Sequence, residues 1–386
     1  MTTLQLRPSE LMIVTVGRFA STTAFRIIYP LIPFLSDRFD ISLQQSASLV
    51  AVQTAASLIS PVGGRLADRF GERRMMLYAI WAFVIGACCC AVAQDFIWFF
   101  AGYLGIGIAT AIYVPAGQSY LSARSAYAER ARAIGIFEMV WAVSAIIGVA
   151  PLMYLINYQQ SSDLAYIVLA VLGVASALLL WRLPDTHHDA NATATDTPTP
   201  FVFTSHVWFL LLFPLLAFGG IDLFFVSQST WLKDQLAADE AMIGALFVLI
   251  GIAELLGSSA VVMFADRIGK RRSVVYGFSL TCICLIAMAL FGQSWWSVAI
   301  FVFIFYAFIE YSIVASFPLM SETVPYARGT MMALMTAAVG IGRIFSSLGS
   351  EWVYLQGGLL TVAGVASFAC IIGLFALTRS PLTPKH

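Results

Sequence analysis

The sequence predicts an all-helical membrane protein in which twelve transmembrane helices form two pseudo-symmetric bundles of six. Three observations predict this fold: an apolar composition, twelve apolar runs long enough to cross a bilayer, and a motif that occurs once in each half of the chain. A closed β-barrel would need strands of about ten residues with alternating polarity. No stretch of the chain alternates in this way, so we expect helices alone.

The composition places the chain in lipid. Of its 386 residues 60% are hydrophobic and 11% are charged, and the mean hydropathy is +0.86. Soluble domains have about 45–50% apolar and about 25% charged residues. This excludes a secreted enzyme, a nucleic-acid-binding protein and an anchor for a large soluble head. The six cysteines lie in apolar runs without zinc-type spacing, so we expect no metal, cofactor or disulfide framework.

Apolar runs separated by short polar breaks mark the expected helices. Their windows are 9–36, 43–66, 75–94, 97–121, 132–156, 163–182, 205–232, 241–264, 273–292, 295–321, 329–352 and 357–378. The segment 183–204 is rich in Thr, Ala, Asp and Pro and lacks apolar periodicity, which is typical of a linker. We therefore expect bundles at 1–182 and 205–386. The first run lacks a cleavage pattern and predicts a retained helix.

Basic residues predict the orientation. Sixteen Lys and Arg fall on the side of the termini and the linker, two (Arg38 and Lys233) fall on the other side, and three lie inside spans. By the positive-inside rule both termini and the linker are cytoplasmic. We expect a multi-pass protein of a bacterial inner membrane.

A repeated motif relates the two halves. GRLADRFGERR occupies residues 64–74, and VMFADRIGKRR occupies residues 262–272. FLSD at residues 34–37 matches WLKD at residues 231–234 with nearly the same shift. The two matches predict a duplication whose halves are related by an axis along the membrane normal.

With these features the chain resembles the major facilitator superfamily. The resemblance covers essentially the whole chain and rests on the two six-helix halves, the cytoplasmic linker and the loop after the second helix. It implies a central cavity lined by the first, fourth, seventh and tenth helices, which opens to each side in turn. The chain departs from proton-coupled and drug-exporting relatives at two places. Ala101 or Gly102 stands where such relatives carry Arg, and Gly148 and Pro151 are not adjacent.

The repeated loop is the expected cytoplasmic gate. The resemblance implies that Asp68 lies near the start of the eleventh helix, latching the halves in one state. Gly71 predicts a tight turn, and the arginines could equally serve to anchor the loop at the anionic leaflet. The candidate gating residues are Gly64, Asp68, Arg69, Gly71, Arg73, Arg74, Asp266, Arg267 and Gly269.

Ionisable residues inside the spans are the candidates for substrate binding or ion coupling. They are Arg18, Arg26, Glu138, Asp222, Glu254, Glu310 and Arg343. Each costs about 2.5–3.5 kcal/mol at a helix centre on insertion scales, so such residues usually face a cavity or a partner. Repeat symmetry suggests that Arg26 faces Asp222 across the cavity, with Glu310 near Asp222. The acids are candidate proton carriers, with structural ion pairing as the alternative role.

The sequence thus predicts a secondary active transporter that works by alternating access on a small organic solute. We favour proton-coupled export of an amphiphilic metabolite or drug. The alternative is uptake or facilitated transport of an organic anion bound by intramembrane arginines. An enzyme is not expected, since no histidine lies deep in a span, and a primary pump is not expected, since no phosphate-binding loop occurs. A non-transporting receptor or scaffold is a further alternative, which would bind a solute without accumulating it. We expect a monomer that binds its solute, protons and lipid, and no nucleic acid.

Overall fold

The computed structural model describes residues 6–60, 66–67, 69–125, 127–184, 205–323 and 328–379. These residues belong to two compact units. The first unit contains residues 1–28 and 52–195, and the second contains residues 29–51 and 196–386. The division falls inside the first helix, so that its last third, residues 29–39, belongs to the second unit. Most of the linker expected at 183–204 lies outside the described residues.

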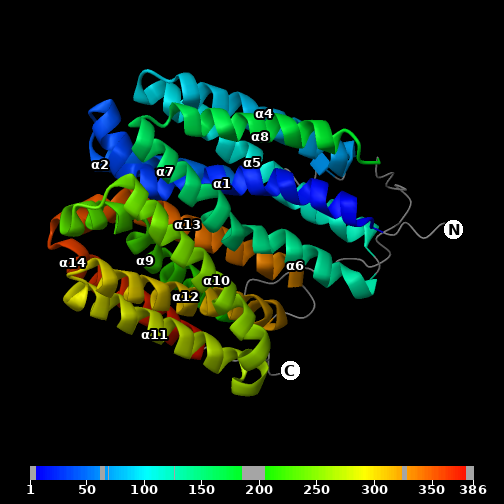
Figure 1. Ribbon diagram of the computed structural model, residues 1–386. Coiled ribbons are helices and arrows are strands. Elements are labelled where there is room, and N and C mark those ends of the chain that lie inside the picture. Colours follow the sequence, from blue (N-terminus) through cyan, green and yellow to red (C-terminus); the bar gives the residue numbers. More distant parts are fainter. Residues whose placement is uncertain are drawn as a thin grey trace. The chain divides into compact units, whose positions relative to one another are not determined.

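The first unit is built from long helices (Figure 1). They are the N-terminal part of α1 (Pro8–Phe39), α4 (Glu72–Val92), α5 (Phe96–Arg124), α6 (Tyr127–Ser144), a π-helical segment η1 (Ala145–Val149), α7 (Ala150–Gln159) and α8 (Asp163–Leu180). Helix α4 packs against both α5 and α8. The segment α6–η1–α7 is one span, and its π turn ends two residues before Pro151, which cannot donate a backbone hydrogen bond.

The second unit contains the remaining helices. They are most of α2 (Leu43–Ser57), α9 (Ser205–Leu236), α10 (Glu240–Ile268), α11 (Lys270–Phe291), α12 (Trp295–Thr323), α13 (Arg328–Leu355) and α14 (Gly358–Arg379), together with the end of α1. Helix α9 packs between α13 and α14, and α12 packs against α10 and α11.

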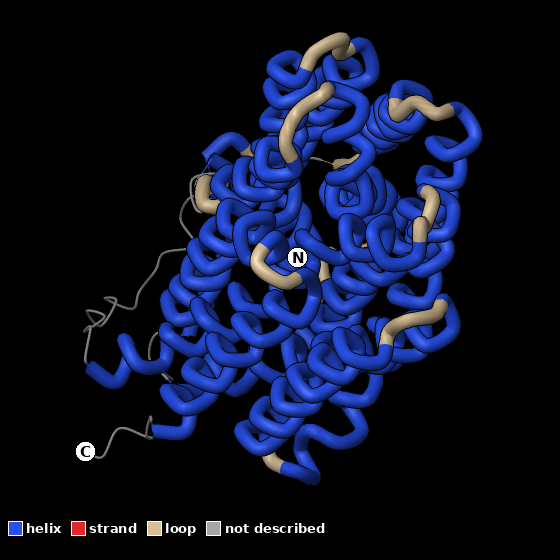
Figure 2. Tube along the Cα trace, turned by 90° about the vertical axis from the view of Figure 1, so that its left-hand side faces the viewer, coloured by secondary structure: helices blue, strands red, loops and turns tan. Residues whose placement is uncertain are grey.

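The predicted fold class is confirmed. A described helix falls in every one of the twelve predicted windows, and the described residues form helices and loops without a strand (Figure 2). Ten of the described helical stretches are long and apolar enough to cross a membrane. Many large apolar side chains on them are exposed, for example Ile97 at 78% and Phe368 at 67%, as expected of helices that face lipid tails.

The repeated motif has the same backbone geometry in both copies. Gly71 precedes α4 with a φ of 90°, and Gly269 precedes α11 with a φ of 92°. Side chains disfavour this left-handed region, so each copy requires glycine to turn sharply between two spans. The predicted turn at Gly71 is therefore confirmed.

Candidate functional site

An ion pair with a buried carboxylate and a partly buried guanidinium lies in the second unit. The guanidinium Nε of Arg343 on α13 lies 3.1 Å from Oδ1 of Asp222 on α9. The same guanidinium donates a second hydrogen bond to the hydroxyl of Tyr29, in the C-terminal half of α1. Asp222 is 1% exposed, and its Oδ2 has no hydrogen-bond partner among the described residues. Arg343 thus connects an acid of the seventh span to a phenol of the first.

Two glycines bring these helices together. A Cβ added to Gly219 on α9 would lie 2.8 Å from Cα of Gly342 on α13, so neither position has room for a side chain. Ser346, one turn beyond Gly342, donates a hydrogen bond to the carbonyl of Gly219. This close approach positions the Arg343 guanidinium, next to Gly342, to reach the Asp222 carboxylate.

A second charge pair lies in the first unit. Nη2 of Arg18 on α1 lies 3.5 Å from Oε2 of Glu138 on α6, and Nε2 of Gln118 on α5 donates to Oε1 of Glu138 at 2.7 Å. Arg18 is buried and lies 5.3 Å from the centre of the Phe137 ring, whereas the Glu138 side chain is 43% exposed. The cation is therefore the desolvated member of this pair.

Arg26 binds an aromatic residue of α6. Its Nη1 donates to the carbonyl oxygen of Trp141 at 2.7 Å, and its guanidinium lies 4.6 Å from the centre of the indole ring. Arg26 is only 4% exposed. Arg26 and Asp222 belong to different units, and each has a partner within its own, so the suggested pairing of the two stays a prediction.

The remaining acids lie on α10 and α12. Oε1 of Glu310 accepts a hydrogen bond from the hydroxyl of Ser258 at 2.9 Å, and Glu254 is 4% exposed. The bond from Ser258 joins α10 to α12, which is a structural role for Glu310. The expected position of Glu310 near Asp222 stays a prediction.

The proposed gating loop is only partly described. Gly64 and Asp68 lie outside the described residues, as does the side chain of Asp266. Arg69, Arg74 and Arg267 are exposed. Arg73 instead donates to the carbonyl oxygens of Trp181 at 2.6 Å and Leu180 at 3.3 Å, at the end of α8.

Two further features of the structure have no counterpart among the residues singled out from the sequence. Glu10 and Arg124 form a two-pronged ion pair, with distances of 2.9 and 3.0 Å, in which both side chains are buried. Glu351 on α13 lines a hollow in the second unit. Glu10, Arg124 and Glu351 lie near span ends, where charged residues are common, so the sequence does not single them out. In the described part of the chain no three His, Cys, Asp or Glu side chains group closely enough to hold a metal ion.

Comparison with known proteins decides the family. The family model described as the Major Facilitator Superfamily matches residues 14–228 and 209–386. The chain belongs to the major facilitator superfamily. It is therefore a multi-pass membrane protein of a family of transporters, which bind small-molecule substrates.

Two relatives and one solved structure are similar to this chain at less than 25% identity. The MFS-type transporter YwfA of Bacillus subtilis is 24% identical over 371 residues, covering 93% of this chain and 89% of the relative. A multi-drug resistance efflux pump PmrA homolog of Lactococcus lactis is 22% identical over 299 residues, covering 74% and 73%. A crystal structure of a D-xylose-proton symporter superposes with a TM-score of 0.78 at 17% identity, covering 97% of this chain and 98% of that one. The last comparison shows the superfamily fold alone.

Proposed function

We propose that this chain is a proton-coupled secondary transporter that exports an amphiphilic organic solute by alternating access. The observation that carries the proposal is the shared guanidinium of Arg343. It binds Asp222 on one side and Tyr29 on the other, and one carboxylate oxygen of Asp222 is left without a hydrogen-bond partner among the described residues. The name of the efflux pump homolog from Lactococcus lactis supports export as the direction.

The proposed role of Asp222 is to carry the proton. When Oδ2 takes up a proton, the carboxyl loses its charge and its attraction for Arg343 falls. Arg343 then keeps its hydrogen bond to Tyr29, so protonation changes how α13 holds the C-terminal part of α1. Because α1 continues into the first unit, a change in this bond reaches both units through the covalent chain.

The other residues have supporting roles in this proposal. The Arg18–Glu138 pair and the Arg26–Trp141 contact join α1 to α6, which gives the first span a fixed partner in the first unit. Buried charges of both signs are suited to an amphiphilic solute with a polar end. The loops around Gly71 and Gly269 are proposed to form the cytoplasmic gate.

The proposal is tested by solute flux in proteoliposomes. Purified protein is reconstituted with an acidic lumen, and accumulation of ethidium is followed by fluorescence. Wild type is expected to accumulate the dye only while the pH gradient lasts. Asp222→Asn is expected to lose gradient-driven accumulation and to keep exchange of internal for external dye, because only the proton step is removed.

A matched control is Asp40→Asn, which removes an exposed carboxylate where α1 ends. It is expected to behave as wild type. Gradient-driven accumulation that survives in Asp222→Asn would refute the role of Asp222. If wild type carries benzoate and not ethidium, the organic-anion alternative replaces export of an amphiphile.

A further inference from the structure

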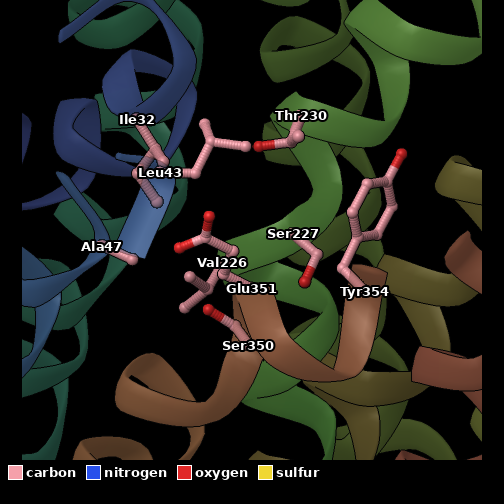
Figure 3. A pocket seen from close by; sticks show the side chains of 9 residues that line it. All are labelled: Ile32, Leu43, Ala47, Val226, Ser227, Thr230, Ser350, Glu351 and Tyr354. Carbon is pink, nitrogen blue, oxygen red and sulfur yellow. The ribbon is translucent and has the colours of Figure 1, made fainter. Parts of the chain in front are cut away.

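A partly open hollow lies in the second unit, where α1, α9 and α13 approach their C-terminal ends. It is lined by Ile32, Leu43, Ala47, Val226, Ser227, Thr230, Ser350, Glu351 and Tyr354. In Figure 3 the carboxylate of Glu351 points into the hollow, toward the side formed by Leu43 and Ala47. No described residue forms an ion pair or hydrogen bond with this carboxylate. Glu351 lies eight residues beyond Arg343, about 12 Å along the helix axis, so this is a separate place from the Asp222 site.

Three of the four hydroxyl groups of the lining, those of Ser227, Ser350 and Tyr354, already donate their protons to other groups. Ser227 donates to the carbonyl oxygen of Leu223 at 2.7 Å, and Ser350 donates to that of Ser347 at 3.1 Å. Tyr354 donates to Oδ2 of Asp234 at 2.7 Å, and Figure 3 shows its hydroxyl directed away from Glu351. The oxygens of Ser227 and Ser350 can therefore only accept hydrogen bonds from a molecule in the hollow. Together with the carboxylate they form a surface that accepts hydrogen bonds.

The surroundings of the hollow are negatively charged. The ends of these helices, with the turns between them, carry six acids and two bases: Asp37, Asp40, Asp234, Asp239, Glu240 and Glu351 against Arg38 and Lys233. Lys233 is already bound by Glu240 at 2.9 Å and Asp37 at 3.5 Å. An excess of negative charge around a pocket raises the local concentration of cations.

The rest of the lining is apolar. Ile32, Leu43, Ala47 and Val226 form hydrocarbon walls, and the ring of Tyr354 adds an aromatic face that can attract a cation. A metal ion would need several oxygen ligands in place of this hydrocarbon. An anion would be repelled by the carboxylate of Glu351 and by the lone pairs of the serine oxygens. A cation with N–H donors and a short alkyl chain is complementary to this lining. Its donors can bind the carboxylate and the serine oxygens, and its alkyl chain can contact the hydrocarbon.

We propose that this hollow binds a small primary or secondary organic ammonium, with its N–H groups on Glu351 and the serine oxygens and its alkyl chain against Ile32, Leu43 and Val226. The site depends on neither the direction of transport nor the role of Asp222. It adds a cation-binding place at the end of the second unit opposite the basic loop around Gly269.

The first test is a thermal-shift titration of the purified full-length protein in detergent. A ligand that binds only the folded state raises the melting temperature. Butylammonium is expected to stabilise wild type at concentrations up to about 10 mM, while tetramethylammonium, which has no N–H donor, and butyrate have no effect. Glu351→Gln is expected to weaken butylammonium binding at least about tenfold, since it removes a charged acceptor.

The matched control is Asp40→Asn, which removes the same charge from the same end without touching the hollow. Asn also tolerates the φ of 51° at this position. This variant should bind butylammonium as wild type does. An equal loss in both variants would mean that only the general negative field attracts the amine, and an absent shift in wild type would overturn the site.

A second measurement needs no variant. A hydrophobic carbodiimide reacts with carboxyl groups in apolar surroundings, and the modified peptide is quantified by mass spectrometry. The amine can also capture the activated carboxyl as a butylamide with release of the urea, so both products are counted. Their sum at Glu351 in wild type is expected to fall severalfold when butylammonium is present and to be unchanged by butyrate. Equal modification with and without butylammonium would refute the proposal even if Glu351→Gln does not fold.

Discussion

Arg73 and Arg271 stand 198 residues apart in the sequence, and each donates a hydrogen bond to a backbone carbonyl near the end of the last helix of its own unit. Arg73 reaches the carbonyl oxygen of Trp181 at 2.6 Å, and Arg271 reaches that of Leu377 at 2.5 Å. The last carbonyls of a helix lack intrahelical donors and carry partial negative charge. The repeated motif therefore has a structural role in both units, whatever its part in gating.

This relationship predicts a selective loss of stability. Arg73→Ala and Arg271→Ala should each lower the free energy of unfolding by about 1–2 kcal/mol, because helix carbonyls lose a charged donor. Denaturation of the purified protein measures the change. The exposed neighbours Arg74 and Arg272 supply matched controls, and their alanine variants should be near neutral. Equal losses at all four positions would show that net charge is the cause.

The buried pair of Asp222 and Arg343 should be strongly non-additive. Asp222→Asn leaves a guanidinium without its counter-charge inside the protein, which costs about 3–5 kcal/mol when one partner of a buried pair is removed. The double variant Asp222→Asn with Arg343→Gln should be more stable than the sum of the singles predicts. A double-mutant cycle of unfolding free energies measures the coupling. Additive losses would contradict the pairing.

The pair in the first unit should respond asymmetrically. Arg18 is buried, so removing Glu138 leaves a desolvated cation without its counter-charge. Glu138 is half exposed, so removing Arg18 leaves a carboxylate that water can solvate. Glu138→Gln should therefore destabilise the protein by about 2–4 kcal/mol, and Arg18→Met by about 1 kcal/mol or less. Thermal or denaturant unfolding of the two variants decides the order. The reverse order would show that the Coulombic attraction outweighs desolvation here.

A contact between α1 and the π-helical segment predicts a compensating pair of mutations. A Cβ on Gly148 would collide with the hydroxyl of Thr23 and lie 2.8 Å from its methyl carbon. Gly148→Ala should cost about 1–3 kcal/mol through overpacking. Thr23→Ala alone should cost little in hydrogen bonding, since Thr23 Oγ1 has no such partner in the described residues. The double variant should melt at a higher temperature than Gly148→Ala, and a failure to recover would contradict the contact.

Much of the fold could be predicted from the sequence because lipid imposes a simple rule. Every span must satisfy its own backbone hydrogen bonds, so length and hydropathy reveal the helices. The turn glycines were also predictable, since a left-handed φ at a span junction favours one residue type. The π turn before Pro151 was not, because hydropathy does not report the hydrogen-bond register inside a span.

The sequence indicates which charged residues lie inside spans, and it does not indicate which of them pair. Charges deep in spans are conspicuous, which is how Arg18, Glu138, Asp222 and Arg343 could be named. Periodicity places a residue on a helix face and says nothing of which helix packs there, so the Arg343–Asp222 pair could not be foreseen. Glu351 could not be singled out from the sequence, because a carboxylate near the end of a span adds little to the free energy of membrane insertion.

The membership of residues 29–51 in the second unit has a consequence for biosynthesis. Tyr29 and its partner Arg343 are 314 residues apart in the chain. At about 5–20 residues per second, the ribosome delivers Arg343 roughly 15–60 seconds after Tyr29. During that interval Leu31 and Leu35, which are fully buried in the finished protein, lack the helices of the second unit. The insertion machinery or the surrounding lipid must cover the apolar side chains of residues 29–51 until α13 is synthesised. In a chain that ends after α8, these residues would never gain the helices against which they pack.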